Sequence, residues 1–596
     1  MSAPDTARYL QDEEEETFAA FDRTVVARIS GFVRPYHARL YAALAAVGLF
    51  VLCQLAVPLL IRAGIDSAVR GGEGLHRVIA LFAIVLAANA VAGYWQENWA
   101  ARLAQQVIFD LRSAMVRHLQ SVSLGVLDQT HVGRIMSRLQ GDVNACQEFL
   151  ETSVSAVGDL FLLLGICVVL VWLDWRLGAV TLTVLPVMVA IRAVWLPRVQ
   201  ATFRRAKDAS SIVNAALAEN INGIRTVIGA RRENVNLAAF EAKVAANRDA
   251  QIAAAHRAHA MAPAVEALTG LALAAIVLGG GWGVATGRIA LGMMVAYIFY
   301  VQRFFEPIRT LTQQYTVMQR AMAGGQRILE VLDVPVHVAD APDATALTVR
   351  EAGIELAHVT FGYRPDRPVL HDVSLRLAPG EVGALVGPTG SGKTSIAGLI
   401  KRFYDVWSGS VRVGGFDVRS VTQASLGRTV GMVLQEPFLF TGTVLDNIRL
   451  NSGAPREAVI AAAQAVHAHD FITALPHGYD TRLDQRGQNL SQGQRQLLGF
   501  ARALVADPAI LILDEATANV DSFTEARIQA ALRTLLKGRT SLIIAHRLAT
   551  IRDADRIFVL DQGHLVEQGR HDDLVAAGGL YASLVARGGA SFDDAA

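Results

Sequence analysis

The sequence is poor in charge and in cysteine. Charged residues make up only 18% of the 596 residues and the formal net charge is +1, so there is no basic excess of the kind that favours nucleic acid binding. Cys53, Cys146 and Cys167 lack the spacing of a metal site, and we expect three buried, reduced thiols. Apolar residues reach 52%, which is high for a soluble protein and moderate for a chain that lies half in lipid.

The N-terminal residues also lack the apolar core of a cleavable signal peptide. They carry instead the acidic run Asp12 to Glu16. That run argues against a mitochondrial presequence as well, because such presequences are rich in arginine and poor in acidic residues. We expect residues 1–30 to form a solvated acidic tail followed by the start of a helix.

Residues 31–322 alternate long apolar runs with polar helical stretches. Six runs approach the roughly 20 residues that a helix needs to cross a bilayer. They lie near Leu40–Ile65, Val78–Tyr94, Val154–Leu173, Leu177–Trp195, Met261–Val284 and Ile289–Phe305. Two long connections are rich in arginine, which places them and the N-terminus in the cytoplasm. The pattern predicts an all-α membrane domain with six spans in a lipid bilayer, rather than core helices of a soluble protein.

Several of these runs contain ionisable residues at a similar depth. At 1.5 Å per residue, they fall roughly 20–25 Å from the outer ends of the spans, Arg309 slightly deeper. The residues are Asp159, Arg192, Glu266, Arg303, Glu306 and Arg309. One hypothesis is that they line an internal cavity, with Asp159 and Arg192 as neighbours. The alternative is that they mark the cytoplasmic mouth or form structural pairs; their signs are balanced, so they do not indicate the charge of a substrate.

The pattern changes beyond residue 353. The segments "IELAHVTF", "EVGALVG" and "AILILD" are typical of strands, and they alternate with helical stretches. Strands interleaved with helices predict a soluble α/β domain with a mostly parallel sheet over residues 353–588. Residues 323–352 are then a linker and residues 589–596 a C-terminal tail.

Residues 387–394 read "GPTGSGKT", a P-loop that follows a strand and opens a helix. Its glycines let backbone N–H groups turn toward phosphates, Lys393 would reach the β and γ oxygens of ATP, and the Thr394 hydroxyl would ligate Mg²⁺. The residues expected to bind the nucleotide here are Gly387, Pro388, Thr389, Gly390, Ser391, Gly392, Lys393, Thr394 and Ser395.

A second buried strand ends in the carboxylates Asp514 and Glu515. With a P-loop at this spacing, Asp514 would hold the metal shell and Glu515 would act as general base on the attacking water. Taken alone, such a pair is more often a helix cap or a solvated strand end. Gln435 and His546 each follow an apolar, strand-like run, which by itself indicates only a strand end.

The segment "LSQGQ" at residues 490–494, 97 residues beyond Lys393 and followed by "LILDE" and His546, resembles the nucleotide-binding domain of ABC transporters. A six-span membrane half followed by that domain resembles an ABC exporter half-transporter, and the resemblance covers nearly the whole chain after the N-terminal tail. Residues 126–143 and 218–233 look like the two cytoplasmic coupling segments of that family.

The resemblance implies roles for four further residues. Tyr363 matches the aromatic residue that stacks on adenine, although an ordinary strand-end tyrosine is the alternative. Gln435 matches the glutamine that lies near Mg²⁺ and the coupling segments, and it joins Glu515 as a candidate catalytic residue. His546 matches the histidine that contacts the γ-phosphate, and Asp521 the aspartate of the D-loop.

The "LSQGQ" loop is a second phosphate site that has no charged side chain. Ser491 stands where a helix N-cap is expected, Gly493 leaves room for close approach and Gln494 follows. A helix N-terminus with free N–H groups attracts anions. In the family this loop faces the γ-phosphate held by the other subunit's P-loop, so the resemblance implies a dimer with two ATP at a shared interface.

Three departures from the family pattern leave the partner open. Gln492 replaces the second signature glycine, Gln485 stands where exporters commonly have glutamate, and the D-loop reads "ANVD". The partner is therefore a second copy of this chain or a different half-transporter. The predicted function is ATP-driven export by alternating access across a bacterial cytoplasmic membrane, with the nucleotide-binding domain in the cytoplasm. The alternative is a non-pumping ABC ATPase that regulates a membrane partner; the motifs are shared by exporters of many substrates and do not specify one.

Overall fold

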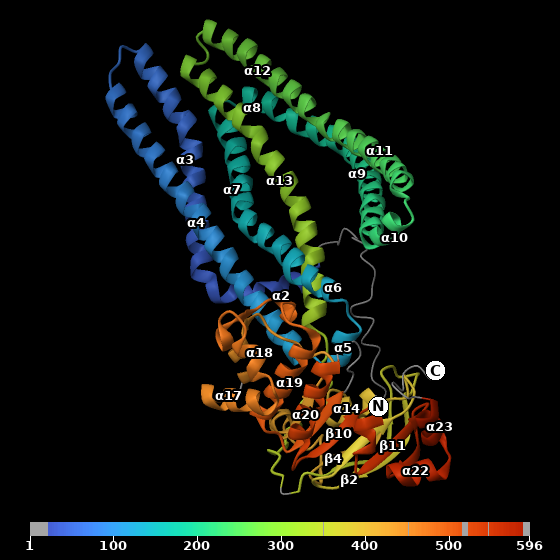
Figure 1. Ribbon diagram of the computed structural model, residues 1–596. Helices are drawn as coiled ribbons and strands as arrows, with labels where there is room; N and C mark the ends of the chain where they lie inside the picture. The colour runs from blue at the N-terminus through green and yellow to red at the C-terminus, as the bar shows by residue number, and fades with distance from the viewer. Residues whose placement is uncertain (1–21, 350, 451, 515–521, 546–547, 588–596) are drawn as a thin grey trace. The chain divides into compact units, whose positions relative to one another are not determined.

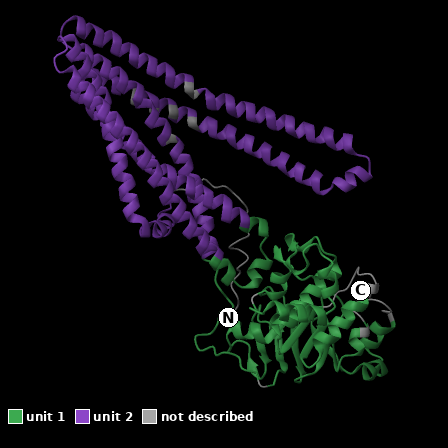
Figure 2. Cartoon of the chain, turned by 60° about the vertical axis from the view of Figure 1, so that its left-hand side comes forward, with its two compact units in different colours: residues 1–13, 117–135, 333–596 green, residues 14–116, 136–332 purple. Residues whose placement is uncertain are grey.

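The computed structural model describes residues 22–349, 351–450, 452–514, 522–545 and 548–587. Their contacts divide the chain into two compact units (Figure 2). Of the described residues, unit 2 contains those up to Val116 together with Met136–Leu332. Unit 1 contains the residues from Asp333 onward and, in addition, the short stretch Arg117–Ile135. A piece of the membrane half of the sequence therefore packs with the C-terminal half.

The membrane half is entirely helical in its described residues (Figure 1). Its helices are α2 (Arg23–Val33), η1 (Arg34–Tyr36), α3 (His37–Val69), α4 (Leu75–Ser121), α5 (Leu124–Asp128), α6 (Val132–Ser137), η2 (Arg138–Asp142), α7 (Val143–Leu173), α8 (Trp175–Leu182), α9 (Val184–Asn222), α10 (Ile224–Gly229), α11 (Glu233–His259), α12 (Met261–Ala285) and α13 (Leu291–Leu332). Helices α9 and α11 run side by side, and the short α10 joins their ends (Figure 1).

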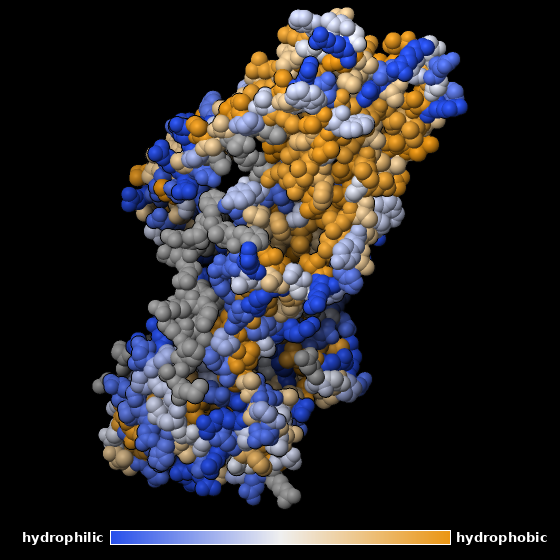
Figure 3. Space-filling view, turned by 180° about the vertical axis from the view of Figure 1, so that it is seen from behind, coloured by the Kyte–Doolittle hydropathy of each residue, from blue (hydrophilic) through white to orange (hydrophobic). Residues whose placement is uncertain are grey.

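Five helical stretches among the described residues are long and apolar enough to cross a membrane. They are Arg23–Val69, Leu75–Ser121, Val132–Leu173, Trp175–Asn222 and Glu233–Ala285. Much of their surface is hydrophobic and exposed (Figure 3), as lipid contact requires. The sixth predicted run forms the first half of α13, which is 42 residues long but is not among these five. This part of α13 carries Gln302, Arg303 and Glu306, which lower its apolar character.

Helix α13 packs against α3 and α7 through buried tyrosines. The hydroxyl of Tyr297 lies 2.5 Å from the carbonyl oxygen of Leu170, and that of Tyr300 lies 2.5 Å from the carbonyl oxygen of Leu55. The Asp66 carboxylate accepts the N–H of Gly292 at 3.1 Å, at the start of α13. These bonds satisfy polar groups that would be costly to leave unpaired away from water.

Asp159 and Glu266 of the predicted ionisable layer are among the described side chains. The Asp159 carboxylate on α7 hydrogen-bonds the Thr310 side chain of α13 and is repelled by the Glu306 carboxylate on the same helix. The side chain of Arg192 lies outside the described residues, so the pairing of Asp159 with Arg192 stays a prediction. Glu266 on α12 is exposed in the single chain.

In its described residues, the part of unit 1 that follows Asp333 contains three β-sheets. A six-stranded sheet has the order β12-β11-β3-β10-β9-β6, and all its neighbours are parallel except β12, which is antiparallel to β11. Its strands are β3 (Val382–Val386), β6 (Val430–Val433), β9 (Ile510–Asp514), β10 (Thr540–Ile544), β11 (Arg556–Asp561) and β12 (His564–Gly569). The mostly parallel sheet predicted from the sequence is thus confirmed.

A second, antiparallel sheet was not predicted. It has the order β2-β1-β4-β5, and a small pair β7-β8 lies elsewhere in the unit. The strands are β1 (Ile354–Phe361), β2 (Leu370–Leu377), β4 (Ser408–Val413), β5 (Phe416–Asp417), β7 (Gly442–Thr443) and β8 (Arg482–Leu483). The sequence "IELAHVTF" does form a strand, β1, but it belongs to this antiparallel sheet.

Two hydrophobic cores enclose the parallel sheet. Along β9, Ile510 and Ile512 face the core that also contains the antiparallel sheet, whereas Leu511 and Leu513 face the core built with α19 and α20. Because both faces are buried, the strand is apolar throughout. The unit's helices are α14 (Lys393–Ile400), α15 (Gln423–Thr429), α16 (Val444–Arg449), α17 (Arg456–Ala465), α18 (His469–Thr473), η3 (Gly478–Asp480), η4 (Gln485–Gly487), α19 (Gln492–Ala506), α20 (Ser522–Leu536), α21 (Leu548–Arg552), α22 (His571–Ala577) and α23 (Leu580–Arg587).

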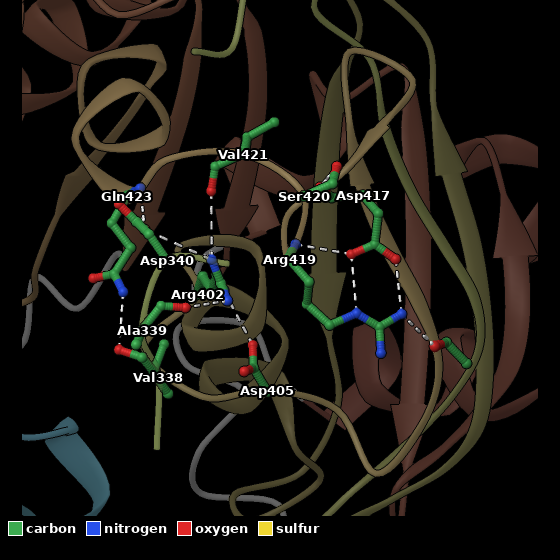
Figure 4. A network of polar contacts seen from close by, with 11 residues as sticks. Val338, Ala339, Asp340, Arg402, Asp405, Asp417, Arg419, Ser420, Val421 and Gln423 are labelled. Carbon is green, nitrogen blue, oxygen red and sulfur yellow. Dashed lines mark hydrogen bonds and ion pairs between the residues drawn. The ribbon is translucent and has the colours of Figure 1, made fainter. Parts of the chain in front are cut away.

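The chain after α13 is fastened to unit 1 by the buried Arg402. The guanidinium donates from Nη2 to the carbonyl oxygen of Ala339 at 3.0 Å (Figure 4). Gln423 bonds the same stretch twice at 2.9 Å, from its backbone N–H to the Asp340 carboxylate and from its side chain to the Val338 carbonyl oxygen. Helix α13 itself continues to Leu332, so the residues expected to form a linker are a helix end followed by a segment held on unit 1.

Candidate active site

The register of the parallel sheet gathers four candidate segments at one edge. Leu385 of β3 pairs with Ile544 of β10, and Ile544 pairs with Asp514 of β9. In turn Leu513 of β9 pairs with Val433 of β6. The P-loop follows β3, Asp514 ends β9, and Gln435 and His546 each follow in sequence two residues after the end of their strands. The carboxyl ends of parallel strands are where α/β proteins bind ligands.

The P-loop has a backbone that glycine alone accommodates. Gly387 has φ +153°, and a Cβ there would come within 2.1 Å of the carbonyl oxygen of Leu560. Gly392 has φ +100°, and a Cβ there would lie 2.5 Å from the Leu370 side chain. Helix α14 begins immediately afterwards, at Lys393. The loop therefore presents the N-terminus of α14, with its free N–H groups, at the edge where the other segments meet.

Polar side chains of the loop suit a triphosphate. The Lys393 ammonium donates to the carbonyl oxygens of Gly387 at 2.7 Å and Pro388 at 3.0 Å, so it is held on the loop and not turned away. The hydroxyl of Ser391 is buried and has no hydrogen-bond partner among the described residues. Thr394, the first residue after Lys393, is exposed. An orphaned buried hydroxyl on the loop that also holds the Lys393 ammonium fits a site that a phosphate completes.

Tyr363 lies beside the P-loop helix. Its hydroxyl is 2.9 Å from the hydroxyl of Ser395 on α14, and the residue is 44% exposed. Phe361 and Tyr404 contact its ring edge-on, with centroids 5.1 and 5.2 Å away. The tyrosine is therefore fixed on its protein side and keeps exposed surface, which is what stacking on a base requires.

The "LSQGQ" loop forms the predicted helix start. Ser491 is the N-cap of α19, and its hydroxyl accepts the N–H of Gln494 at 3.2 Å. The Gln494 side chain returns to accept the Ser491 N–H at 2.9 Å, which completes a capping box. Ser491 is exposed and Gly493 is buried. The first turn of α19 is thus held in place without a charged side chain.

Glu515, Asp521 and His546 lie outside the described residues, so their roles stay predictions. Asp514, half-buried, and the exposed Gln435 are described, at the ends of neighbouring strands.

Tyr404 is a neighbour of the nucleotide site that was not predicted from the sequence. Besides contacting Tyr363, its hydroxyl hydrogen-bonds the carboxylate of Asp128, which is 276 residues away in the chain. No local pattern marks such a residue. The available signal was only an aromatic residue four positions beyond the end of the P-loop helix.

Fold and site together define the class: a helical membrane domain joined to a P-loop ATPase domain, with a capped-helix loop ahead of the strand β9 that ends in Asp514. Residues 41–308 match the family model described as "ABC transporter transmembrane region", and residues 370–518 match the one described as "ABC transporter". The chain belongs to the ABC transporter family.

Its relatives have the same organisation over nearly their full length. The chain is 38% identical over 584 residues to the uncharacterized ABC transporter ATP-binding protein YknV of Bacillus subtilis (strain 168), with 97% of each chain covered. It is 34% identical over 566 residues to the ATP-dependent lipid A-core flippase of Syntrophus aciditrophicus (strain SB), covering 94% of this chain and 93% of that one.

A solved structure of a bacterial Atm1-family ABC exporter with ATP bound is similar to this chain. The TM-score is 0.75 at 30% identity, covering 93% of this chain and 98% of that one. These findings confirm the exporter-type half-transporter, its two-part fold and its ATPase domain.

Proposed function

We propose that this chain pairs with a second half-transporter, either another copy of itself or a related chain, and exports a substrate by alternating access. The observation that carries the proposal is the exposed, capped N-terminus of α19. It offers N–H groups and a positive dipole end to an anion, while the P-loop of the same chain already provides a complete phosphate cradle. A second anion site of this kind suits the γ-phosphate of a nucleotide held by the partner.

The residues at the sheet edge fit ATP with Mg²⁺. Thr394, Gln435 and Asp514 supply the oxygen ligands that Mg²⁺ prefers, and the ion would neutralise charge on the β and γ oxygens. In this scheme Lys393 binds the same oxygens, Glu515 accepts a proton from the attacking water, and His546 orients the γ-phosphate. Tyr363 stacks on the base.

The γ-phosphate is then the group that couples chemistry to movement. When the γ-phosphate lies between Lys393 of one chain and Ser491 of the partner, it favours the closed pair. Only the closed state lets the phosphate contact both residues at once. Hydrolysis removes the shared contact and lets the two domains part. The coupling segments pass this motion to the membrane domains, which alternate between the two sides of a bacterial cytoplasmic membrane.

Mixing two inactive variants tests whether the site is shared. Glu515→Gln should bind ATP yet lose about 100-fold or more of its turnover, because the general base is lost. Ser491→Arg should also be inactive, because it fills the loop that receives the partner's phosphate. In a mixed pair, one interface has an intact Glu515 from one chain and an intact Ser491 from the other. Random pairing of equal amounts should restore roughly a quarter of wild-type ATPase activity.

The matched control is Glu457→Gln, an exposed glutamate on α17, which should keep full activity. A mixture that stays inactive, although the wild-type chain alone is active, would contradict the shared site. A wild-type chain that is inactive alone but active with a related half-transporter would instead identify the heterodimer. The lipid A-core flippase among the relatives makes lipids the first substrates to assay in reconstituted vesicles.

A further inference from the structure

Helix α5 is too short to be stable by itself. It has five residues, Leu124–Asp128, whereas isolated helices below about 12–15 residues are marginal in water. Its stability must come from what it touches in unit 1. Val126 is 6% exposed, and a Cβ added to Gly125 would lie 3.2 Å from the ring of Tyr404, so the helix backbone rests directly on that ring.

Two hydrogen bonds join the C-terminal end of α5 to the aromatic pair Tyr404 and Tyr363. The Tyr404 hydroxyl donates to the carboxylate of Asp128, the last residue of α5. The next residue, Gln129, donates from its side chain to the backbone carbonyl oxygen of Tyr363 at 3.4 Å. Burial raises the pKa of Tyr404 and the hydrogen bond to Asp128 raises it further, so the hydroxyl stays protonated and remains a donor.

The aromatic pair is in turn tied to the P-loop helix. The Tyr363 hydroxyl is 2.9 Å from that of Ser395 on α14, and its ring meets Tyr404 edge-on at 5.2 Å. Tyr404 also contacts Phe361, at 5.5 Å, which leaves its ring little freedom to move. A continuous set of contacts therefore runs from α14 through Tyr363 and Tyr404 to α5, all within unit 1.

We propose that Tyr404 is a positioning residue through which a base stacked on Tyr363 strengthens the docking of α5 of the same chain. The inference rests on the proposed function, since it takes Tyr363 as the base-stacking residue. A purine on the exposed side of Tyr363 restricts the motion that its ring retains on that side, and this restriction holds Tyr404 more closely in the orientation that bonds Asp128. Coupling between two sites is reciprocal, so α5 docking also favours base binding.

The test is amide hydrogen exchange of residues 124–130 in the full-length chain in lipid nanodiscs. ATP should slow exchange there about fivefold, the effect of one net hydrogen bond. Tripolyphosphate, which has the phosphates but no base, should slow exchange in α14 as ATP does and leave residues 124–130 unchanged. Equal effects of the two ligands on residues 124–130 would overturn the proposal.

Variants separate this route from a general loss of structure. Tyr404→Phe keeps the ring and removes the bond to Asp128, so ATP should still protect α14 while the fivefold effect on α5 disappears. Asp128→Asn retains an acceptor and should keep the effect, whereas Asp128→Ala should lose it. Tyr479→Phe removes a hydroxyl that bonds His469 elsewhere in the unit and is the matched control.

The experiment distinguishes a failure of the proposed nucleotide site from a failure of the proposed role of Tyr404. If ATP protects neither α14 nor α5 in the wild-type chain, the nucleotide site itself is wrong and the inference falls with it. If ATP protects α14 normally but Tyr404→Phe still shows the fivefold slowing at residues 124–130, the nucleotide site stands and the role of Tyr404 is refuted.

Discussion

The two predicted coupling segments differ in how their apolar side chains are covered. In the first, residues 126–143, Val126 is 6% exposed and Val143 is fully buried, whereas Val132 and Met136 are 74% and 45% exposed. In the second, residues 218–233, the side chains of Ile221, Ile224 and Ile228 are 62%, 48% and 58% exposed. Helix α10, at the centre of the second segment, contains no buried residue.

This difference indicates that the first segment is covered by its own chain at its α5 end, around Val126, and that the second segment needs cover from elsewhere. Exposed apolar groups that follow one another from the end of α9 into α10 are typical of an interaction site. Unit 1 carries an apolar surface of its own, where Phe438 and Phe440 are exposed and lie edge-to-face at 5.1 Å. Arg502 and Asn447 brace this surface through the carbonyl oxygens of Phe438 and Phe440, at 3.0 and 2.8 Å. In the proposed pair, the second coupling segment of the partner can cover this surface at Phe438 and Phe440.

Removing the apolar face of the second segment should have the largest effect. Replacing Ile221, Ile224 and Ile228 together by serine should weaken nucleotide-dependent pairing by about 100- to 1000-fold, because each isoleucine contributes on the order of 1 kcal/mol or more when buried. Pairing can be measured by chemical cross-linking of nanodisc-embedded chains across a concentration series with ATP.

The matched control changes Val566 and Val575 to serine, two valines that are similarly exposed on unit 1. Both sets of variants should keep the thermal stability of the single chain, since exposed substitutions usually change it by less than about 0.5 kcal/mol. Unchanged pairing in the isoleucine variant would mean that the two segments do not differ in the way their exposure indicates.

In the first segment, a substitution should act on the single chain and not on pairing. Val126→Ala should destabilise the docked α5 by about 1–2 kcal/mol, because it leaves a cavity at a buried site. Faster amide exchange of residues 124–130 without nucleotide would report it. Val132→Ala, at a position that is 74% exposed, should change nothing. Equal exchange in both variants would show that Val126 is not held in place.

Local sequence signals were sufficient for the nucleotide site's scaffold. The P-loop glycines and Lys393 follow one another in the chain, and the short apolar run Ile510–Leu513 is typical of a buried strand. Because parallel strands end at a common edge, the order of the motifs already indicated that Asp514 and the P-loop would meet. Ser491 was identifiable as an N-cap because a cap acts on the helix that follows it directly in the sequence.

Contacts between distant residues had no such signal. The bond between Tyr404 and Asp128 and the hold of Arg402 on Ala339 depend on how α14 is placed against other elements, and no periodicity records that. Of the antiparallel sheet only β1 was recognised: β1 pairs with its sequence neighbour β2 and β4 with β5, but the pairing of β1 with β4 joins strands more than 40 residues apart and has no local signal. The end of α13 at Leu332 was missed because its last turns are helix-forming but not apolar enough to stand out.

The smallest expected effects come from one glycine in each segment. A Cβ at Gly125 in α5 would lie 3.2 Å from the Tyr404 ring, whereas a Cβ at Gly229 in α10 would meet nothing within 4 Å. Alanine favours a helix over glycine by up to about 1 kcal/mol, so Gly229→Ala should stabilise α10 by about 0.5 kcal/mol. At Gly125 the same gain is opposed by a ring that Asp128, Tyr363 and Phe361 hold in place, and Gly125→Ala should destabilise α5 by about 0.5 kcal/mol. Amide exchange should therefore slow slightly in α10 and quicken slightly in α5; changes of the same sign in both would show that the Tyr404 ring yields and that α5 is docked no more firmly than α10.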